Sequence, residues 1–135
     1  MQKVFGADNI NTTLLDNAYA SLGTTSAAEV VEAPIADVQK YASSWASDYN
    51  DAAIAVFTRL GGESNDTAMY GEDGSHFLGL QANEKDLMKY LQEQKAAGTF
   101  KKIIVIINAD QMMELDWLDD YDVDACVLAG VPGVT

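Results

Sequence analysis

Residues 51–66 carry the pattern that decides the fold, and they read DAAIAVFTRLGGESND. The apolar run at residues 52–57 is typical of a strand, and the turn after it holds Gly61 and Gly62 among charged side chains. An α/β domain presents functional groups at the carboxyl edge of its sheet in this way. Both glycines can take positive φ and let the backbone approach a ligand closely. An ordinary polar loop with a helix cap would have the same pattern.

Two side chains of this turn have chemistry that suits a functional site. Arg59 has a planar fork of donors that can hold a hydroxyl or a carboxylate. Glu63 can donate or accept a proton. The irregular segment that follows, residues 65–81, is long for a compact domain, and loops of that length are often functional. It contains Glu72 and the chain's only histidine, His76.

The rest of the chain alternates helical and strand patterns. Residues 103–107 are a β-branched apolar run, typical of a parallel strand buried on both faces, and residues 124–129 predict a further strand. Apolar spacing predicts helices at residues 12–22, 35–47, 84–97 and 111–118, with a possible strand at residues 29–32. Asn83 is the predicted cap of the third helix, and Gly98 its end. Alternating elements predict a single parallel α/β domain over residues 1–135.

Composition excludes several functional classes. The net charge of −13 argues against nucleic acid and against anionic membrane surfaces as partners. Cys126 has no second cysteine to pair with, and one histidine without suitable partners makes no zinc site, so we expect no metal and no cofactor. The acidic residues at 119–124 are interpreted as a solvated connection. No secretory signal is recognisable at the start of the sequence, which favours a cytoplasmic location.

Three blocks in fixed order carry a family resemblance. They are residues 51–66, residues 73–91 (DGSHFLGLQANEKDLMKYL) and residues 101–133 (KKIIVIINADQMMELDWLDDYDVDACVLAGVPG). Together they resemble the C-terminal α/β-sandwich domain of glycoside hydrolase family 3, the β-glucosidases and their relatives. The resemblance implies a three-layer α/β/α sandwich with a mostly parallel sheet, and a fragment of a larger two-domain enzyme.

The resemblance also implies a retaining mechanism on β-linked glucosides or related carbohydrates. Two carboxyl groups about 5 Å apart act in such a mechanism, one as nucleophile and one as acid/base. In the family an N-terminal barrel supplies the aspartate nucleophile, and the sandwich supplies the acid/base and sugar contacts. No barrel is present in these 135 residues, so this chain is expected to be inactive alone. Its expected partner is the barrel of the same parent chain.

Residue roles follow from the family's R-x-x-G-E-G-x-D loop. Glu63 matches the glutamate and is the candidate acid/base, while Glu72, in the same long loop, is the rival candidate. Arg59 and Asp66 match the flanking positions and are expected to orient the loop or to contact sugar hydroxyls. A salt bridge between Arg59 and Asp66 is the structural alternative. Ser64 replaces the second glycine, and positive φ there would cost serine about 1 kcal/mol or more.

A second interpretation is not enzymatic. An isolated α/β domain of this type could also bind a carbohydrate or act as a regulatory module. In either case we expect the missing partner surface to leave an exposed apolar patch, which would favour self-association into a homo-oligomer.

Overall fold

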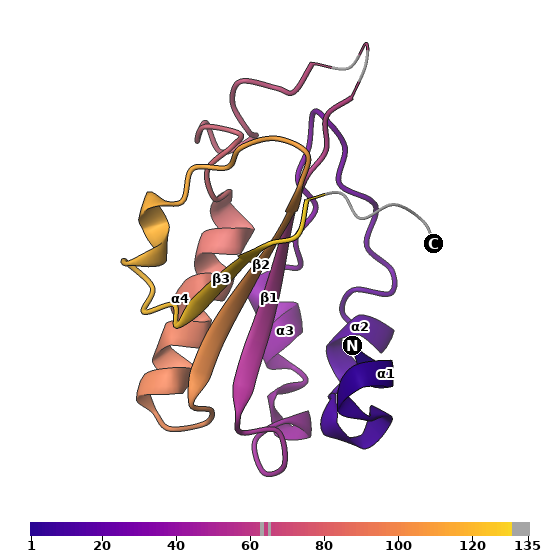
Figure 1. Ribbon diagram of the computed structural model, residues 1–135, viewed down its shortest axis with the longest axis vertical. Coiled ribbons are helices and arrows are strands. Elements are labelled where there is room, and N and C mark those ends of the chain that lie inside the picture. Colours follow the sequence, from indigo (N-terminus) through magenta and orange to yellow (C-terminus); the bar gives the residue numbers. More distant parts are fainter. Residues whose placement is uncertain (63, 65, 131–135) are drawn as a thin grey trace.

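The computed structural model describes residues 1–62, 64 and 66–130. Its centre is a parallel sheet of three strands in the order β1-β2-β3. The strands are β1 (Ala52–Arg59), β2 (Lys102–Ala109) and β3 (Ala125–Leu128). Because the strands are parallel, their carboxyl ends lie at one edge of the sheet, and the long segment after β1 leaves from that edge (Figure 1). The predicted parallel α/β architecture is confirmed.

Two helices lie against one face of the sheet. Helix α4 (Ala82–Ala96) connects β1 to β2, and the short helix α3 (Ile35–Gln39) packs beside it (Figure 1). The remaining helical segments are single turns: α1 (Gln2–Phe5), η1 (Ala7–Asn9), α2 (Thr13–Asp16), η2 (Ala42–Ser44) and η3 (Asp116–Leu118). Among the described residues, α4 is therefore the main covering element.

The core lies between the sheet and α4. Phe57 of β1 and Ile103 and Val105 of β2 point to this side and are almost completely buried, as is Met88 of α4. Trp117 packs edge-on against the ring of Phe57, with 5.7 Å between the ring centroids. Aromatic pairs in this geometry add stability beyond the area that they bury. The side chain of Trp117 therefore belongs to the core.

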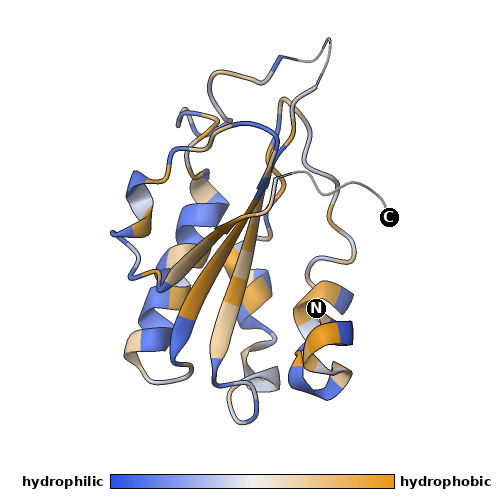
Figure 2. Cartoon of the chain, viewed as in Figure 1, coloured by the Kyte–Doolittle hydropathy of each residue, from blue (hydrophilic) through white to orange (hydrophobic). Residues whose placement is uncertain are grey.

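The opposite face of the sheet is open. Ile54, Val56 and Val127 share that face by strand register, and they remain 44%, 47% and 50% exposed. Figure 2 shows that apolar residues run along most of β1 and β2. Parallel sheets are normally covered on both faces. The described residues supply two layers of the expected three-layer sandwich, and they leave the predicted apolar patch.

The N-terminal third of the chain forms shorter elements than its sequence pattern predicts. The helix predicted at residues 12–22 is limited to α2, and the one at residues 35–47 to α3 and the separate turn η2. No strand forms at residues 29–32. The side-chain amide of Asn11 donates to the carbonyl oxygen of Ser44 at 2.7 Å. Short helices are only marginally stable without packing. Hydrogen bonds between residues far apart in the sequence can therefore replace the longer helices that the local pattern predicts.

The structure also differs from the sequence-based predictions around β2 and α4. The predicted helix at residues 111–118 is only the turn η3, because the backbone N–H of Glu114 donates to the carbonyl of Leu78 at 3.1 Å. The cap of α4 is Gln81 and not Asn83. Gly98 follows the helix with a φ of 81°, which confirms its predicted role as the helix end. Within the described part of the chain, no helix has the length and apolar character needed to cross a bilayer.

The acidic connection before β3 is more than a solvated loop, because Asp124 joins three parts of the fold. Its carboxylate accepts hydrogen bonds from Lys102 and Lys95, both at 2.7 Å, and from the backbone N–H of Ile103 at 2.9 Å. The hydrogen bond from Lys102, followed by those from Lys95 and the backbone, holds the pKa of Asp124 well below its usual range.

This geometry predicts a pH-dependent loss in Asp124→Asn. A carboxyl whose folded pKa is depressed adds stability above its unfolded pKa, about 3.9, and that stability is lost as the pH falls toward the folded pKa. We therefore expect the variant to unfold at lower urea concentration than the wild type at pH 7, and the difference to shrink below about pH 4. The exposed control Asp119→Asn should unfold like the wild type throughout. A constant difference from pH 7 to pH 3 would contradict the prediction.

Candidate functional site at the carboxyl edge of the sheet

Arg59 ends β1 at the carboxyl edge and is completely buried. Its guanidinium forms a bidentate pair with the carboxylate of Glu84, at 2.8 and 2.6 Å. It also donates to the backbone carbonyls of Phe77 at 2.7 Å, Gly79 at 2.6 Å and Thr58 at 2.9 Å. These bonds use all five donors of the guanidinium. In this conformation, contact with a ligand would require Arg59 to release one of them, and its predicted sugar contact stays a prediction.

Glu84 is placed by the start of α4. It is the third residue of the helix, and its carboxylate accepts from the backbone N–H of the cap residue Gln81 at 2.8 Å, which completes a capping box. The same carboxylate therefore caps the helix and neutralises Arg59. Sequence reasoning missed Glu84, because the sequence signal of such a cap begins with Ser, Thr, Asp or Asn, and the cap residue here is Gln81. The pair joins β1, the long segment after it and α4.

The turn that holds the predicted acid/base is described only in part. Glu63 lies outside the described residues. Ser64 has a φ of 67°, in the left-handed region that favours glycine. Asp66 is exposed, and the predicted salt bridge between Arg59 and Asp66 is wrong because Arg59 pairs with Glu84. The carboxylate of Glu84 is buried beside the guanidinium, whereas that of Asp66 is exposed to solvent.

The two glycines of the turn do not need positive φ, contrary to one expectation. Neither Gly61 nor Gly62 adopts it. A Cβ at Gly61 would lie 1.6 Å from Nε2 of Gln111, the end of a flexible side chain that can move aside, so close approach does not by itself require glycine here. The backbone at Gly61 is therefore approached by the side chain of Gln111, which belongs to the segment after β2.

Glu72, the rival acid/base candidate, is exposed and lines a cavity of about 330 Å³ near the start of α4. Glu32 lines the same cavity, whereas Arg59 and Asp66 do not. The carboxylate of Glu32 accepts from the hydroxyl of Tyr19 at 2.6 Å and from its neighbour's backbone N–H. Burial raises the pKa of the Glu32 carboxyl, and burial together with the charge of Glu32 raises the pKa of Tyr19. Glu72 thus shares this cavity with three carboxyl groups that sequence reasoning did not single out, those of Glu29, Glu32 and Asp73.

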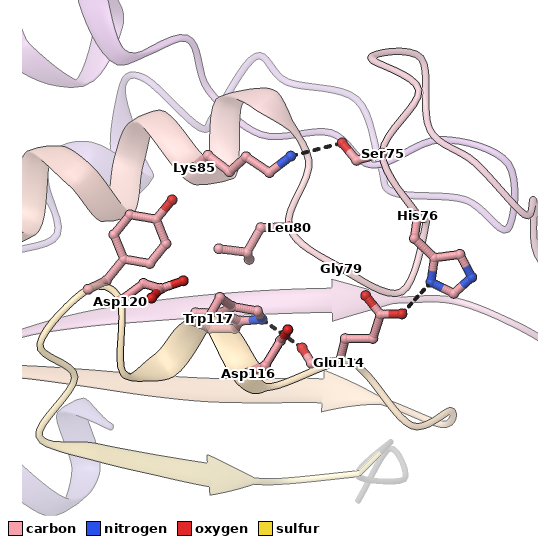
Figure 3. Close-up of a pocket in the computed structure, with 10 residues that line it drawn as sticks. Ser75, His76, Gly79, Leu80, Lys85, Glu114, Asp116, Trp117 and Asp120 are labelled. Carbon is pink, nitrogen blue, oxygen red and sulfur yellow. Dashed lines mark hydrogen bonds and ion pairs between the residues drawn. The ribbon is translucent and has the colours of Figure 1, made fainter.

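A second cavity, of about 240 Å³, is lined by residues of the segment after β1, of α4 and of the segment after β2 (Figure 3). His76 and Glu114 meet at its rim, with 2.8 Å between Nδ1 and Oε1. Lys85 of α4 donates to the hydroxyl of Ser75 at 2.9 Å. These contacts hold residues 75–80 against α4 and against the segment that follows β2. His76 therefore has a structural contact.

Among the described residues, no group of three or more histidine, cysteine, aspartate or glutamate side chains is arranged to hold a metal ion. Burial raises the pKa of the half-buried Cys126, which packs beside the core as a small apolar side chain. A raised pKa makes the thiolate scarce, so Cys126 is a poor nucleophile.

Comparison of the chain with models of protein families, with curated proteins and with solved structures gives no match.

Proposed function

We propose that this chain is the acid/base-bearing α/β domain of a retaining β-glycosidase of the glycoside hydrolase family 3 type. Glu63 is the proposed proton donor, and a β-linked glucoside or a related carbohydrate is the proposed substrate. The nucleophile comes from a barrel domain of the same parent chain. Hydrolysis needs both carboxyl groups, so the isolated domain is inactive.

The observation that carries the proposal is the backbone at Ser64. The family motif has glycine at this position, and glycine adopts positive φ at no steric cost. Serine pays a penalty there, yet Ser64 has a φ of 67°. A left-handed residue directly after Glu63 supports the same turn in this chain as in the motif. The buried pair of Arg59 and Glu84 fixes the base of that turn.

The open sheet face supports a larger parent protein. Apolar side chains on the uncovered face would be buried by a third layer, as the three-layer sandwich requires. We propose that the rest of the parent chain supplies that layer, and that the isolated domain self-associates through the same face. The proposed location is the cytoplasm, in keeping with a single cysteine that can form no internal disulfide.

The test is the length and activity of the native polypeptide. An antibody raised against this domain should detect a product several times longer than 135 residues in the source, and that product should hydrolyse aryl β-glucosides with retention of configuration, as followed by NMR of the released sugar. The isolated domain should show no turnover under the same conditions. A native product of this size, or a full-length product without glycosidase activity, would overturn the proposal.

A further inference from the structure

The cavity of about 330 Å³ joins two segments that are far apart in the sequence. Its lining includes residues 29–32 of an N-terminal segment (residues 25–33), residues 71–73 of the long segment after β1, and the start of α4. The backbone N–H of Ala68 donates to the carbonyl of Ala27 at 2.9 Å, so the N-terminal segment and the long segment lie side by side (Figure 1). This hydrogen bond reports directly on whether the two segments are together.

Among the described residues, the charged side chains that line this cavity are all carboxylic acids. They are Glu29 and Glu32 of the N-terminal segment and Glu72 and Asp73 of the long segment. Hydrogen bonds from Ser75 hold the pKa of Asp73 below its usual range, so this carboxyl group stays ionised. Neighbouring like charges disfavour each other. An ionised Glu32 therefore repels the long segment, whereas a protonated Glu32 does not.

Glu32 is the most enclosed of these four carboxyl groups, since the other three are exposed. Its Oε1 accepts from the hydroxyl of Tyr19 at 2.6 Å and from the backbone N–H of Ala33 at 2.7 Å. Its Oε2 accepts no hydrogen bond from a described residue, which leaves this oxygen free to carry a proton. From α4, the charge of Glu84, itself paired with Arg59, adds to the effect of burial, and the two raise the pKa of Glu32.

We propose that this cavity is a proton-dependent clasp, in which protonation of Glu32 holds the N-terminal segment against the long segment and ionisation of Glu32 releases it. The protonated carboxyl keeps its contacts with Tyr19 and Ala33 and removes one negative charge from the cavity. The inference goes beyond the proposed glycosidase function and is independent of it, because it requires neither Glu63 nor a barrel domain.

The direction of the pH dependence follows from proton linkage. A carboxyl whose pKa is higher in the closed form than in the open form stabilises the closed form fully below the open-form pKa, about 4.3 for glutamate. That stabilisation is lost as the pH rises through the closed-form pKa. The clasp therefore opens toward neutral pH, which is opposite in sign to the effect of Asp124.

Hydrogen exchange of the backbone amides of the 135-residue chain, followed by ¹⁵N–¹H NMR, tests the clasp. The reporter is the amide of Ala68. We expect its protection, corrected for the intrinsic exchange rate at each pH, to fall at least about threefold between pH 5 and pH 7.5, since each unit of pKa difference changes the closing equilibrium tenfold. Amides in the middle of α4 should lose less protection, because the core stays folded when the clasp opens.

Three variants separate the clasp from general effects of charge. Glu32→Gln has a neutral side chain of the same shape, so Ala68 should keep at pH 7.5 the protection that it has at pH 5. Glu93→Gln is the matched control, exposed on α4 and outside the cavity, and it should lose protection as the wild type does. Tyr19→Phe removes a donor to the ionised carboxylate and should enlarge the loss.

Four results would overturn the proposal. The first is a wild-type chain in which the protection of Ala68 does not fall between pH 5 and pH 7.5. The second is a loss in Glu32→Gln as large as that in Glu93→Gln, and the third is a smaller loss in Tyr19→Phe than in the wild type. The fourth is an equal loss at Ala68 and throughout α4, because it would report unfolding of the whole chain.

Discussion

Glu84→Ala should lower the free energy of unfolding by about 3–5 kcal/mol, the usual cost of leaving one member of a buried ion pair without its partner. Arg59 is completely buried, and an arginine side chain does not lose its proton inside a protein. The variant would leave this charge with backbone carbonyls as its only acceptors among the described residues. It would also remove the acceptor for the cap of α4. Domains of this size are stable by only about 5–15 kcal/mol, so the loss is a large share of the total.

Urea unfolding followed by the fluorescence of the two tryptophans, Trp45 and the buried Trp117, measures the effect. Asp86→Ala is the matched control on the same helix, because its exposed side chain should contribute within about 0.5 kcal/mol. The double variant Arg59→Met with Glu84→Met should recover part of the loss, since apolar side chains often replace a buried ion pair at little cost. Recovery should stay partial, because the carbonyls of Phe77 and Gly79 lose their donors. A loss below about 1 kcal/mol in Glu84→Ala would contradict a structural role for the pair.

The central α/β unit of this fold was predictable because its signals are local. A run of β-branched residues defines β2, and an apolar stripe with a glycine stop defines α4, so both were placed within a few residues of their observed bounds. Parallel pairing followed from the alternation of elements. These segments carry enough hydrophobic pattern of their own to override competing local conformations.

The first 50 residues were not predictable to the same degree, because contacts between distant residues limit their helices. The side chain of Asn11 donates a hydrogen bond to the carbonyl of Ser44. In the same way, the backbone N–H of Glu114 donates to the carbonyl of Leu78, so it is not available to the helix that the sequence pattern favours at residues 111–118. The apolar periodicity of the sequence does not indicate these hydrogen bonds between distant residues. Propensity is a weak prior wherever tertiary hydrogen bonds are available.

The candidate site was likewise predictable in its local features and not in its long-range contacts. Arg59 was recognisable from its place after an apolar strand, but neither its burial nor its partner was, since Glu84 lies 25 residues further along the chain. The apolar stripe places Glu84 at the start of a helix, but it does not show what the carboxylate contacts. The cavity lined by Glu72 and Glu32 depends on a segment without regular structure near residue 30, which no pattern places. Pairings of this kind become visible only in three dimensions.

Glu63→Ala in the proposed parent enzyme should lower turnover of a substrate with a poor leaving group, such as a β-linked glucose disaccharide, by about a hundredfold to ten-thousandfold. Protonation of the departing oxygen is the step that such a substrate needs. With 2,4-dinitrophenyl β-glucoside the leaving group departs without a proton, so the first step should proceed at a rate near that of the wild type. Added azide should then restore turnover and yield the β-glucosyl azide, because a small anion attacks the glycosyl-enzyme without base assistance.

Glu72→Ala is the comparison that separates the two candidate residues. Glu72 is exposed and lines a cavity, so its carboxyl group is open to a ligand and is the alternative proton donor to test. If Glu63 is the acid/base, Glu72→Ala should keep both rates within a few-fold of the wild type and show no azide product. The reverse pattern would transfer the role to Glu72. Unchanged rates in both variants would place the acid/base on neither residue, because an enzyme that has lost its proton donor cannot cleave a poor leaving group at the wild-type rate.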